Sequence, residues 1–97
     1  MSIDYRIRED SWVARMATIK LGYRRAAVVI GRTIYLSGAT REEFLADEKW
    51  TRHECCHLAQ YRKYGTVQFV LRYLRESLLH GYHNNRFEIE ARQAEDG

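Results

Sequence analysis

Proline is absent from this 97-residue chain, so helices and strands must be interrupted by its six glycines and by polar clusters. No apolar run approaches the roughly 20 residues that a membrane-spanning helix needs, and we expect no membrane partner. The first ten residues are charged and lack the apolar stretch of a secretory leader, and the sequence therefore predicts a cytoplasmic protein.

Cysteine is scarce as well: the chain has only Cys55 and Cys56. Two adjacent cysteines in a helix are poorly placed to form a stapling disulfide, which accords with a reducing location. Their side chains point about 100° apart, so they cannot chelate one ion together with good geometry. We interpret both as small apolar residues packed in the interior.

The chain also lacks any block of charge of one sign. Its 16 Lys and Arg and 13 Asp and Glu give a net charge of +3, and the basic residues are spread through every segment. Scattered charge is typical of a solvated surface, and we therefore expect no nucleic-acid partner.

Length and hydrophobic content favour a single domain over residues 1–97, in which residues 1–10 are a lead-in without defined structure. Two short runs rich in Val and Ile, separated by Gly31-Arg32, predict a β-hairpin over residues 25–36. The expected fold class is α+β, mostly helical, with this small antiparallel sheet packed on the later helices. Helices are predicted over residues 11–21, 40–46, 47–64 and 66–79, and from residue 84 or 85 onward.

The strongest chemical signal is His53-Glu54-Cys55-Cys56-His57. On a helix, positions i and i+4 share one face, so the two imidazoles can approach a single zinc ion at roughly 2.0–2.1 Å. Glu54 then lies beside the ion, where its carboxylate can accept a proton from water. The predicted helix start at Asp47 and stop at Gly65 place this motif in the middle of a helix.

Catalytic zinc sites usually have three protein ligands, so a third is needed from another element. Glu88 and Glu90 point about 200° apart on the last helix, so only one can face the metal. Glu88 shares a side with Ala91, and we choose it as the ligand, leaving Glu90 to solvent. The chain has four candidates in all: His80, His83, Glu88 and Glu90. His83 is the alternative third ligand.

These residues resemble a known family. The histidine motif followed by Glu88-Ile89-Glu90-Ala91 is similar to the gluzincin metallopeptidases, and the small size is closest to their single-domain members, the minigluzincins. The resemblance covers roughly residues 20–95. It implies a zinc metallopeptidase in which His53, His57 and Glu88 bind one zinc ion. Glu54 would be the general base and later the proton donor.

The resemblance also bears on the substrate. A strand edge beside the cleft would align an extended peptide or protein segment through main-chain hydrogen bonds. The expected strand comprises Thr33, Ile34, Tyr35 and Leu36. Tyr82 is a candidate donor to the oxygen that becomes negative during hydrolysis. The alternative interpretation is that its ring only packs in the core.

One position departs from the family pattern. Larger gluzincins often have an aspartate four residues after the ligand glutamate, where it supports a ligand histidine, but this chain has Arg92 there. An alternative function is therefore a catalytically weak or inactive, zinc-stabilised binding or regulatory module. A further alternative is a basic helical module without metal.

Overall fold

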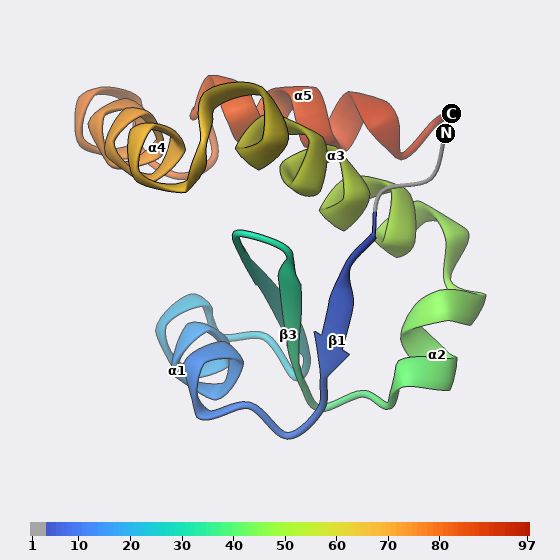
Figure 1. Cartoon of the computed structure of the whole chain (residues 1–97). Helices are drawn as coiled ribbons and strands as arrows, with labels where there is room; N and C mark the ends of the chain where they lie inside the picture. Colours follow the sequence, from blue (N-terminus) through green and yellow to red (C-terminus); the bar gives the residue numbers. More distant parts are fainter. Residues whose placement is uncertain (1–3) are drawn as a thin grey trace.

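The computed structural model describes residues 4–97, over which three strands and five helices follow one another (Figure 1). The predicted fold class, α+β and mostly helical, is confirmed. No helix among these residues combines the length and the apolar character needed to cross a bilayer. In chain order the elements are β1 (Arg6–Arg8), α1 (Trp12–Leu21), β2 (Ala26–Ile30), β3 (Thr33–Ser37), α2 (Arg41–Ala46), α3 (Glu48–Tyr64), α4 (Thr66–His80) and α5 (Arg86–Ala94).

The sheet has the strand order β1-β3-β2. Strands β2 and β3 form the predicted antiparallel hairpin, with Val28 opposite Tyr35. Strand β1 adds a parallel pairing in which Ile7 lies opposite Ile34, so the sheet is mixed rather than purely antiparallel. The prediction that residues 1–10 lack structure is therefore wrong for β1, while residues 1–3 lie outside the described part.

Strand β1 was not predicted, because three residues are too few to establish an alternating pattern. The pattern is nevertheless present: Ile7 is half-buried and packs against the core, while Arg6 and Arg8 are exposed. Pairing with β3, which lies 27 residues further along the chain at Ile34, determines the structure of this segment.

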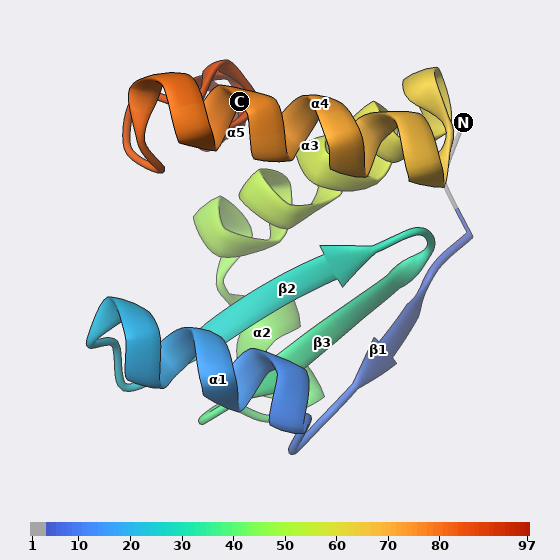
Figure 2. The same ribbon diagram turned by 90° about the vertical axis from the view of Figure 1, so that its left-hand side faces the viewer.

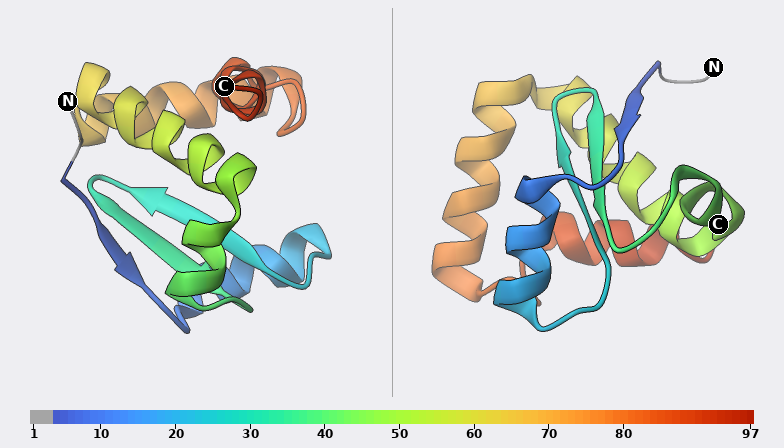
Figure 3. Two further views of the ribbon diagram at one scale, coloured as in Figure 1. Left: turned by 90° about the vertical axis from the view of Figure 1, so that its right-hand side faces the viewer. Right: turned by 90° about the horizontal axis from the view of Figure 1, so that it is seen from below.

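The helices are arranged on both sides of the sheet. Helix α1 packs on one face, and α2 and α3 lie on the other (Figures 1 and 2). Helix α5 lies along the side of α3 that points away from the sheet, whereas α4 begins beside the hairpin turn, where Thr66 lies close to Gly31 (Figures 2 and 3). The core between these layers is small, and its largest fully buried apolar side chains are Ile34, Leu36 and Phe44.

Asp47 fixes the start of the helix that carries the histidines. Its Oδ1 accepts a hydrogen bond from the backbone N–H of Trp50 at 3.1 Å, which caps α3 as predicted. Its Oδ2 accepts from Arg25 at 2.9 Å, which ties the cap to the residue just before β2. The Arg25 guanidinium also lies over the Trp50 ring, 4.5 Å from the centroid. The first turn of α3 is thereby held at one end of the sheet.

Gly38, directly after β3, lies close to the backbone just before β2. It has a φ of +79°, and an added Cβ would lie 2.3 Å from the carbonyl oxygen of Arg24. Gly22 has a similar φ of +74° but open space around it. Gly22→Ala should therefore lower the free energy of unfolding by only about 1–2 kcal/mol, the cost of a left-handed backbone.

Gly38→Ala should lower the free energy of unfolding by roughly 3 kcal/mol or more, because the backbone at Arg24 must move as well. Urea denaturation of both variants in the presence of a chelator measures the difference. Equal losses for the two variants would contradict the close approach at Gly38.

Candidate metal centre

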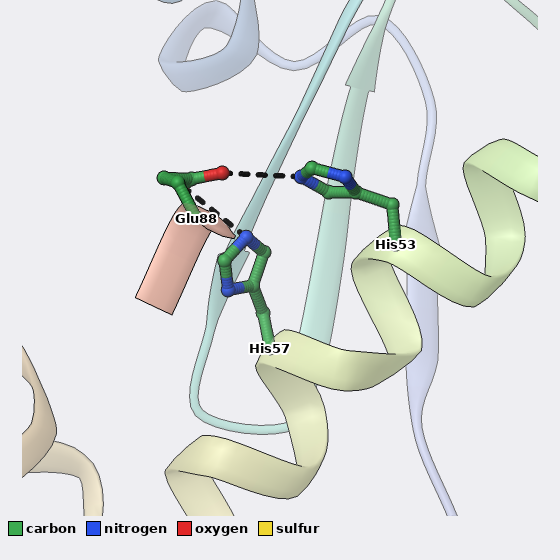
Figure 4. Close-up of side chains that lie close together, drawn as sticks. All are labelled: His53, His57 and Glu88. Atoms are coloured by element: carbon green, nitrogen blue, oxygen red, sulfur yellow. Dashed lines mark hydrogen bonds and ion pairs between the residues drawn. The ribbon is translucent and has the colours of Figure 1, made fainter. Parts of the chain in front are cut away.

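Three polar side chains converge between α3 and α5. His53 and His57 come from adjacent turns of α3, and Glu88 comes from the first turn of α5 (Figure 4). Nε2 of His53 lies 3.1 Å from Oε1 of Glu88, and Nε2 of His57 lies 3.2 Å from Oε2. One ligand atom from each residue lies within 4.8 Å of the other two, so the group can hold a metal ion.

The position of Glu88 follows from the cap of α5. Asn85 is fully buried, and its Oδ1 accepts a hydrogen bond from the backbone N–H of Phe87 at 2.8 Å. Its Nδ2 donates to the carbonyl of Tyr73 at 3.1 Å and to Oγ of Ser77 at 2.9 Å, which anchors the start of α5 on α4. These bonds set the height and rotation of α5, so that Glu88 is buried over α3.

The other candidates for the third ligand lie elsewhere. Glu90 is exposed, as predicted, although it accepts a hydrogen bond from Nε2 of Gln60 at 2.8 Å. His83, the alternative ligand, lies in an exposed turn, and it is not part of the group formed by His53, His57 and Glu88. Glu88 is therefore the residue that the structure brings to the two imidazoles.

Gln60 determines which nitrogen of His57 is free. The amide nitrogen of Gln60 donates to the carbonyl of Phe87 at 3.1 Å and to Glu90, so its Oε1 faces Nδ1 of His57 at 2.8 Å. That oxygen can only accept, so Nδ1 must carry the proton. In the neutral ring the lone pair then lies on Nε2, which points at Glu88, as a metal ligand requires.

Glu95 plays the same part for His53. Its Oε2 lies 2.7 Å from Nδ1, and a carboxylate there favours a proton on that nitrogen. Arg52 donates to the backbone carbonyl of Glu95 at 2.6 and 3.0 Å, which holds the end of α5 in place. Arg92, at the position of the family's aspartate, instead donates to the carbonyl of His83. Glu95 therefore provides a carboxylate partner for His53, which Arg92 cannot do.

Tyr73 is the third residue whose role the sequence did not predict. Its hydroxyl donates to Oε2 of Glu88 at 2.5 Å. By helical spacing Tyr73 belongs with the apolar residues of α4, and only its hydroxyl group indicates a polar role. The signal for Glu95 is clearer, because it follows Glu88 by seven residues, or about two turns, and so shares its helix face.

The centre concentrates negative charge in a buried space. Burial raises the pKa of Glu54, which is only 6% exposed, to about 7. Burial also opposes ionisation of Glu88, but hydrogen bonds from His53, His57 and Tyr73 outweigh it and lower the pKa of this carboxyl. Glu88 is therefore ionised and needs a positive partner.

Protons on the imidazoles supply that charge in the metal-free protein. Burial opposes protonation of both rings, but hydrogen bonds to Glu88 and the nearby carboxylates outweigh it. The pKa of His57 is raised, and that of His53 rises to about 9. A divalent cation would take the place of these protons, and the donor set of two imidazole nitrogens and a carboxylate oxygen fits a catalytic zinc site.

A cavity of about 750 Å³ adjoins this centre. Its walls are mainly apolar and come from β2, α3, α4 and the end of α1, with His53, Glu54, His57 and Glu88 on one side. Tyr82 also lines the cavity and is 41% exposed, and burial of its ring raises the pKa of its hydroxyl. The structure thus places Tyr82 on the wall of the cleft that contains the motif.

The strand expected to align a substrate is not the one beside the cavity. Strand β3, which contains Thr33, Ile34, Tyr35 and Leu36, lies in the middle of the sheet and is paired on both edges. Its backbone groups have no free side for a further strand, so that prediction is wrong. The edge strand along the cavity is β2. The prediction was wrong because β1, which pairs with the other side of β3, was not predicted.

The two cysteines take no part in the cluster. Both are free thiols of intermediate burial, and Cys55 packs against the hydrophobic core. Sγ of Cys56 lies 3.7 Å from Oε1 of Glu90, on the side of α3 that faces α5. The interpretation as an interior packing residue therefore fits Cys55, whereas Cys56 is only half-buried and contacts the polar side chains of Glu90 and Gln60.

Comparison with protein-family models, with curated proteins and with solved structures finds no match, so the centre must be interpreted from its own geometry.

The pKa shifts predict how stability depends on pH in the metal-free protein. His53 has a pKa of about 9 in the folded chain against 6.5 otherwise, so its stabilising effect is complete below about pH 6.5 and lost as the pH rises through 9. The raised pKa of Glu54 acts in the same direction between about 4.5 and 7. With a chelator present, the Tm should fall as the pH is raised from 6 to 9.

Added divalent metal should increase the Tm most at the alkaline end, because fewer protons compete there. Thermal unfolding with and without chelator measures both effects. Glu88→Gln should flatten the pH dependence of the metal-free protein, because it removes the main partner of the histidine protons. A Tm that rises with pH in the presence of the chelator would contradict this arrangement.

Glu95→Gln tests the support of His53. The amide keeps an acceptor near Nδ1 but removes the negative charge, so the affinity for zinc should fall roughly 10–100-fold. Asp96→Asn is the matched control, because it removes the same charge from the neighbouring exposed residue. Competition with a chromophoric chelator measures both affinities, and an equal loss in the two variants would mean that only overall charge matters.

Proposed function

We propose that this centre binds one zinc ion through His53, His57 and Glu88 and hydrolyses peptide bonds, with Glu54 as the general base. The observation that carries the proposal is the convergence of two Nε2 atoms and one carboxylate beside Glu54, on the wall of a cavity with a free strand edge. Two imidazoles and one carboxylate form a common ligand set of catalytic zinc in peptidases.

When bound, zinc supplies Lewis acidity, which polarises a carbonyl and lowers the pKa of water toward about 7. Glu54 accepts the proton of the attacking water. The carboxyl of Glu54 is almost fully buried, and burial favours its protonated form by raising its pKa, so it can take up this proton and then pass it to the leaving nitrogen. The hydroxyl of Tyr82 is the candidate donor to the oxygen that gains negative charge.

The substrate is an extended peptide or protein segment that pairs with β2. This strand lies at the edge of the sheet, so one side of its backbone is free for main-chain hydrogen bonds. The neighbouring walls of the cavity, which include Val28, Val70 and Leu74, are apolar and suit apolar side chains. A substrate aligned along β2 would have its scissile bond beside α3, the helix that carries His53, Glu54 and His57.

The competing function is a zinc-stabilised binding or regulatory module without catalysis. Its main support is Arg92, which leaves the family's usual partner of the histidine missing. Glu95 and Gln60 provide equivalent partners in this chain, at 2.7 and 2.8 Å from the two Nδ1 atoms. This geometry favours the catalytic proposal.

Glu54→Gln separates the two functions. The amide cannot accept the proton, so cleavage of an unstructured protein such as casein should fall roughly 10²–10⁴-fold. Zinc should stay near one ion per chain by elemental analysis, because the three ligands are unchanged. Glu42→Gln, on the exposed face of α2, is the matched control and should leave both zinc content and cleavage as in the wild type.

If the wild type holds zinc but cleaves neither casein nor a library of short peptides, the binding module is the correct interpretation. If the purified protein takes up no zinc under conditions that load other zinc proteins, both functions are wrong.

A further inference from the structure

The most exposed apolar side chains of the described residues are concentrated on one side of the molecule. Every large apolar residue that is more than half exposed belongs to α1, to α4 or to Tyr23 directly after α1. Together they form what we name the apolar face: Trp12, Met16, Ile19, Tyr23, Val67, Leu71, Leu74, Leu78 and Leu79. An apolar surface of this extent usually marks an interaction site.

On α1 the apolar stripe points away from the protein. Ala14 is fully buried, whereas Trp12 and Ile19 are 76% and 69% exposed. At about 100° per residue, Trp12, Met16 and Ile19 lie roughly 140–160° around the helix from Ala14. The stripe therefore lies on the side of α1 that points away from the protein.

Helix α4 repeats this arrangement. Phe69 is buried in the core, while Leu71 is 58% and Leu78 87% exposed. Val67, Leu71 and Leu78 lie roughly 160–180° around the helix from Phe69, so this stripe also faces outward. Both helices lie on the same side of the molecule, in front of the sheet edge in Figure 2, and both contribute to the wall of one cavity.

Of the five Asp, Glu, Lys and Arg residues in α1 and α4, four are basic. Residues 11–37 contain five Lys and Arg, residues 65–75 contain two more, and neither segment contains an acidic residue. Arg15 and Lys20 flank the stripe of α1, Arg75 lies beside that of α4, and none of the three forms an ion pair within residues 4–97. The acidic residue of α4, Glu76, faces Arg86 at 4.0 Å.

We propose that the apolar face is a docking surface for an anionic lipid bilayer. Exposed leucines and isoleucine enter the boundary between headgroups and acyl chains, Trp12 and Tyr23 lie at the headgroup level, and Arg15, Lys20 and Arg75 contact lipid phosphates. Such peripheral binding needs no spanning helix among residues 4–97. It therefore departs from the expectation of no membrane partner, which considered spanning segments alone.

A bilayer fits this surface better than a partner helix does. An amphipathic helix binds by placing its apolar side in a groove. Tyr23 and Leu74 do line the cavity, but the other residues placed above by helical angle lie on the outward sides of the two helices: Trp12, Met16, Ile19, Val67, Leu71 and Leu78. A flat, deformable surface can contact both outward sides at once. The basic residues at the sides of the stripes complement the negative charge of anionic lipids.

Vesicle flotation tests the proposal. The full chain should float with vesicles of equal parts phosphatidylcholine and phosphatidylglycerol, and much less with phosphatidylcholine alone. Trp12→Ser/Leu78→Ser should weaken binding at least roughly tenfold, because it removes two of the most exposed apolar side chains. The matched control is Leu45→Ser/Ile89→Ser, which changes exposed apolar residues outside the face and should leave binding unchanged.

Lys20→Glu/Arg75→Glu should weaken binding by a similar factor, as should high salt, whereas Arg6→Glu/Arg8→Glu on β1 should have little effect. All substituted residues are exposed, and circular dichroism confirms that the variants fold. Chelator should not change binding, so failure of the zinc proposal and failure of this one are distinguishable.

Absence of vesicle binding by the wild type overturns the proposal, as does equal weakening by the face variants and their controls. Sedimentation that shows a dimer, which Trp12→Ser/Leu78→Ser converts to a monomer without any vesicle binding, overturns it in favour of a second copy of this chain.

Discussion

The burial of one carboxylate, that of Glu88, governs the arrangement of the centre. Taking an isolated carboxylate out of water costs several kcal/mol unless charge and hydrogen bonds compensate. Here the two Nε2 atoms of α3 and the hydroxyl of Tyr73 surround it. Because α5 carries Glu88 and the partners come from α3 and α4, the charge can be buried only when all three helices are in register. The same register leaves room for a cation between the imidazoles and Glu88.

The sequence predicted those parts of the structure that depend on local physics. The caps at Asp47 and Thr40 and the stop at Gly65 act within a few residues, and all three are found where expected. The i, i+4 spacing placed His53 and His57 on one face, and the helix geometry of residues 88–91 distinguished Glu88 from Glu90. These predictions hold because a helix converts sequence spacing directly into direction.

The parts that were not predicted depend on which elements meet. Strand β1 is fixed by pairing with β3, which left β2 rather than Thr33–Leu36 at the edge of the sheet. Helical spacing groups Tyr73 with the apolar residues of α4, because periodicity identifies a face of a helix but not what that face contacts. The outward orientation of Trp12, Met16 and Ile19 was hidden for the same reason. Spacing cannot tell an apolar side that fills the core from one that meets another surface.

The exposed apolar side chains of α1 and α4 and the polar contacts at the metal centre are both related to the small size of the core. A domain of this length has few apolar side chains to bury, and eight large ones on α1 and α4 are more than half exposed. The helices of the centre pack through the aromatic rings of Tyr61, Phe69 and Phe87. Polar contacts of Asn85, Gln60 and Glu95 with the histidines and their neighbours join them further. The stability of these polar contacts depends on how well the buried charge of Glu88 is compensated. A cation held by the two histidines and Glu88 would therefore contribute to folding as well as to chemistry, since its binding free energy is gained only when α3 and α5 are together.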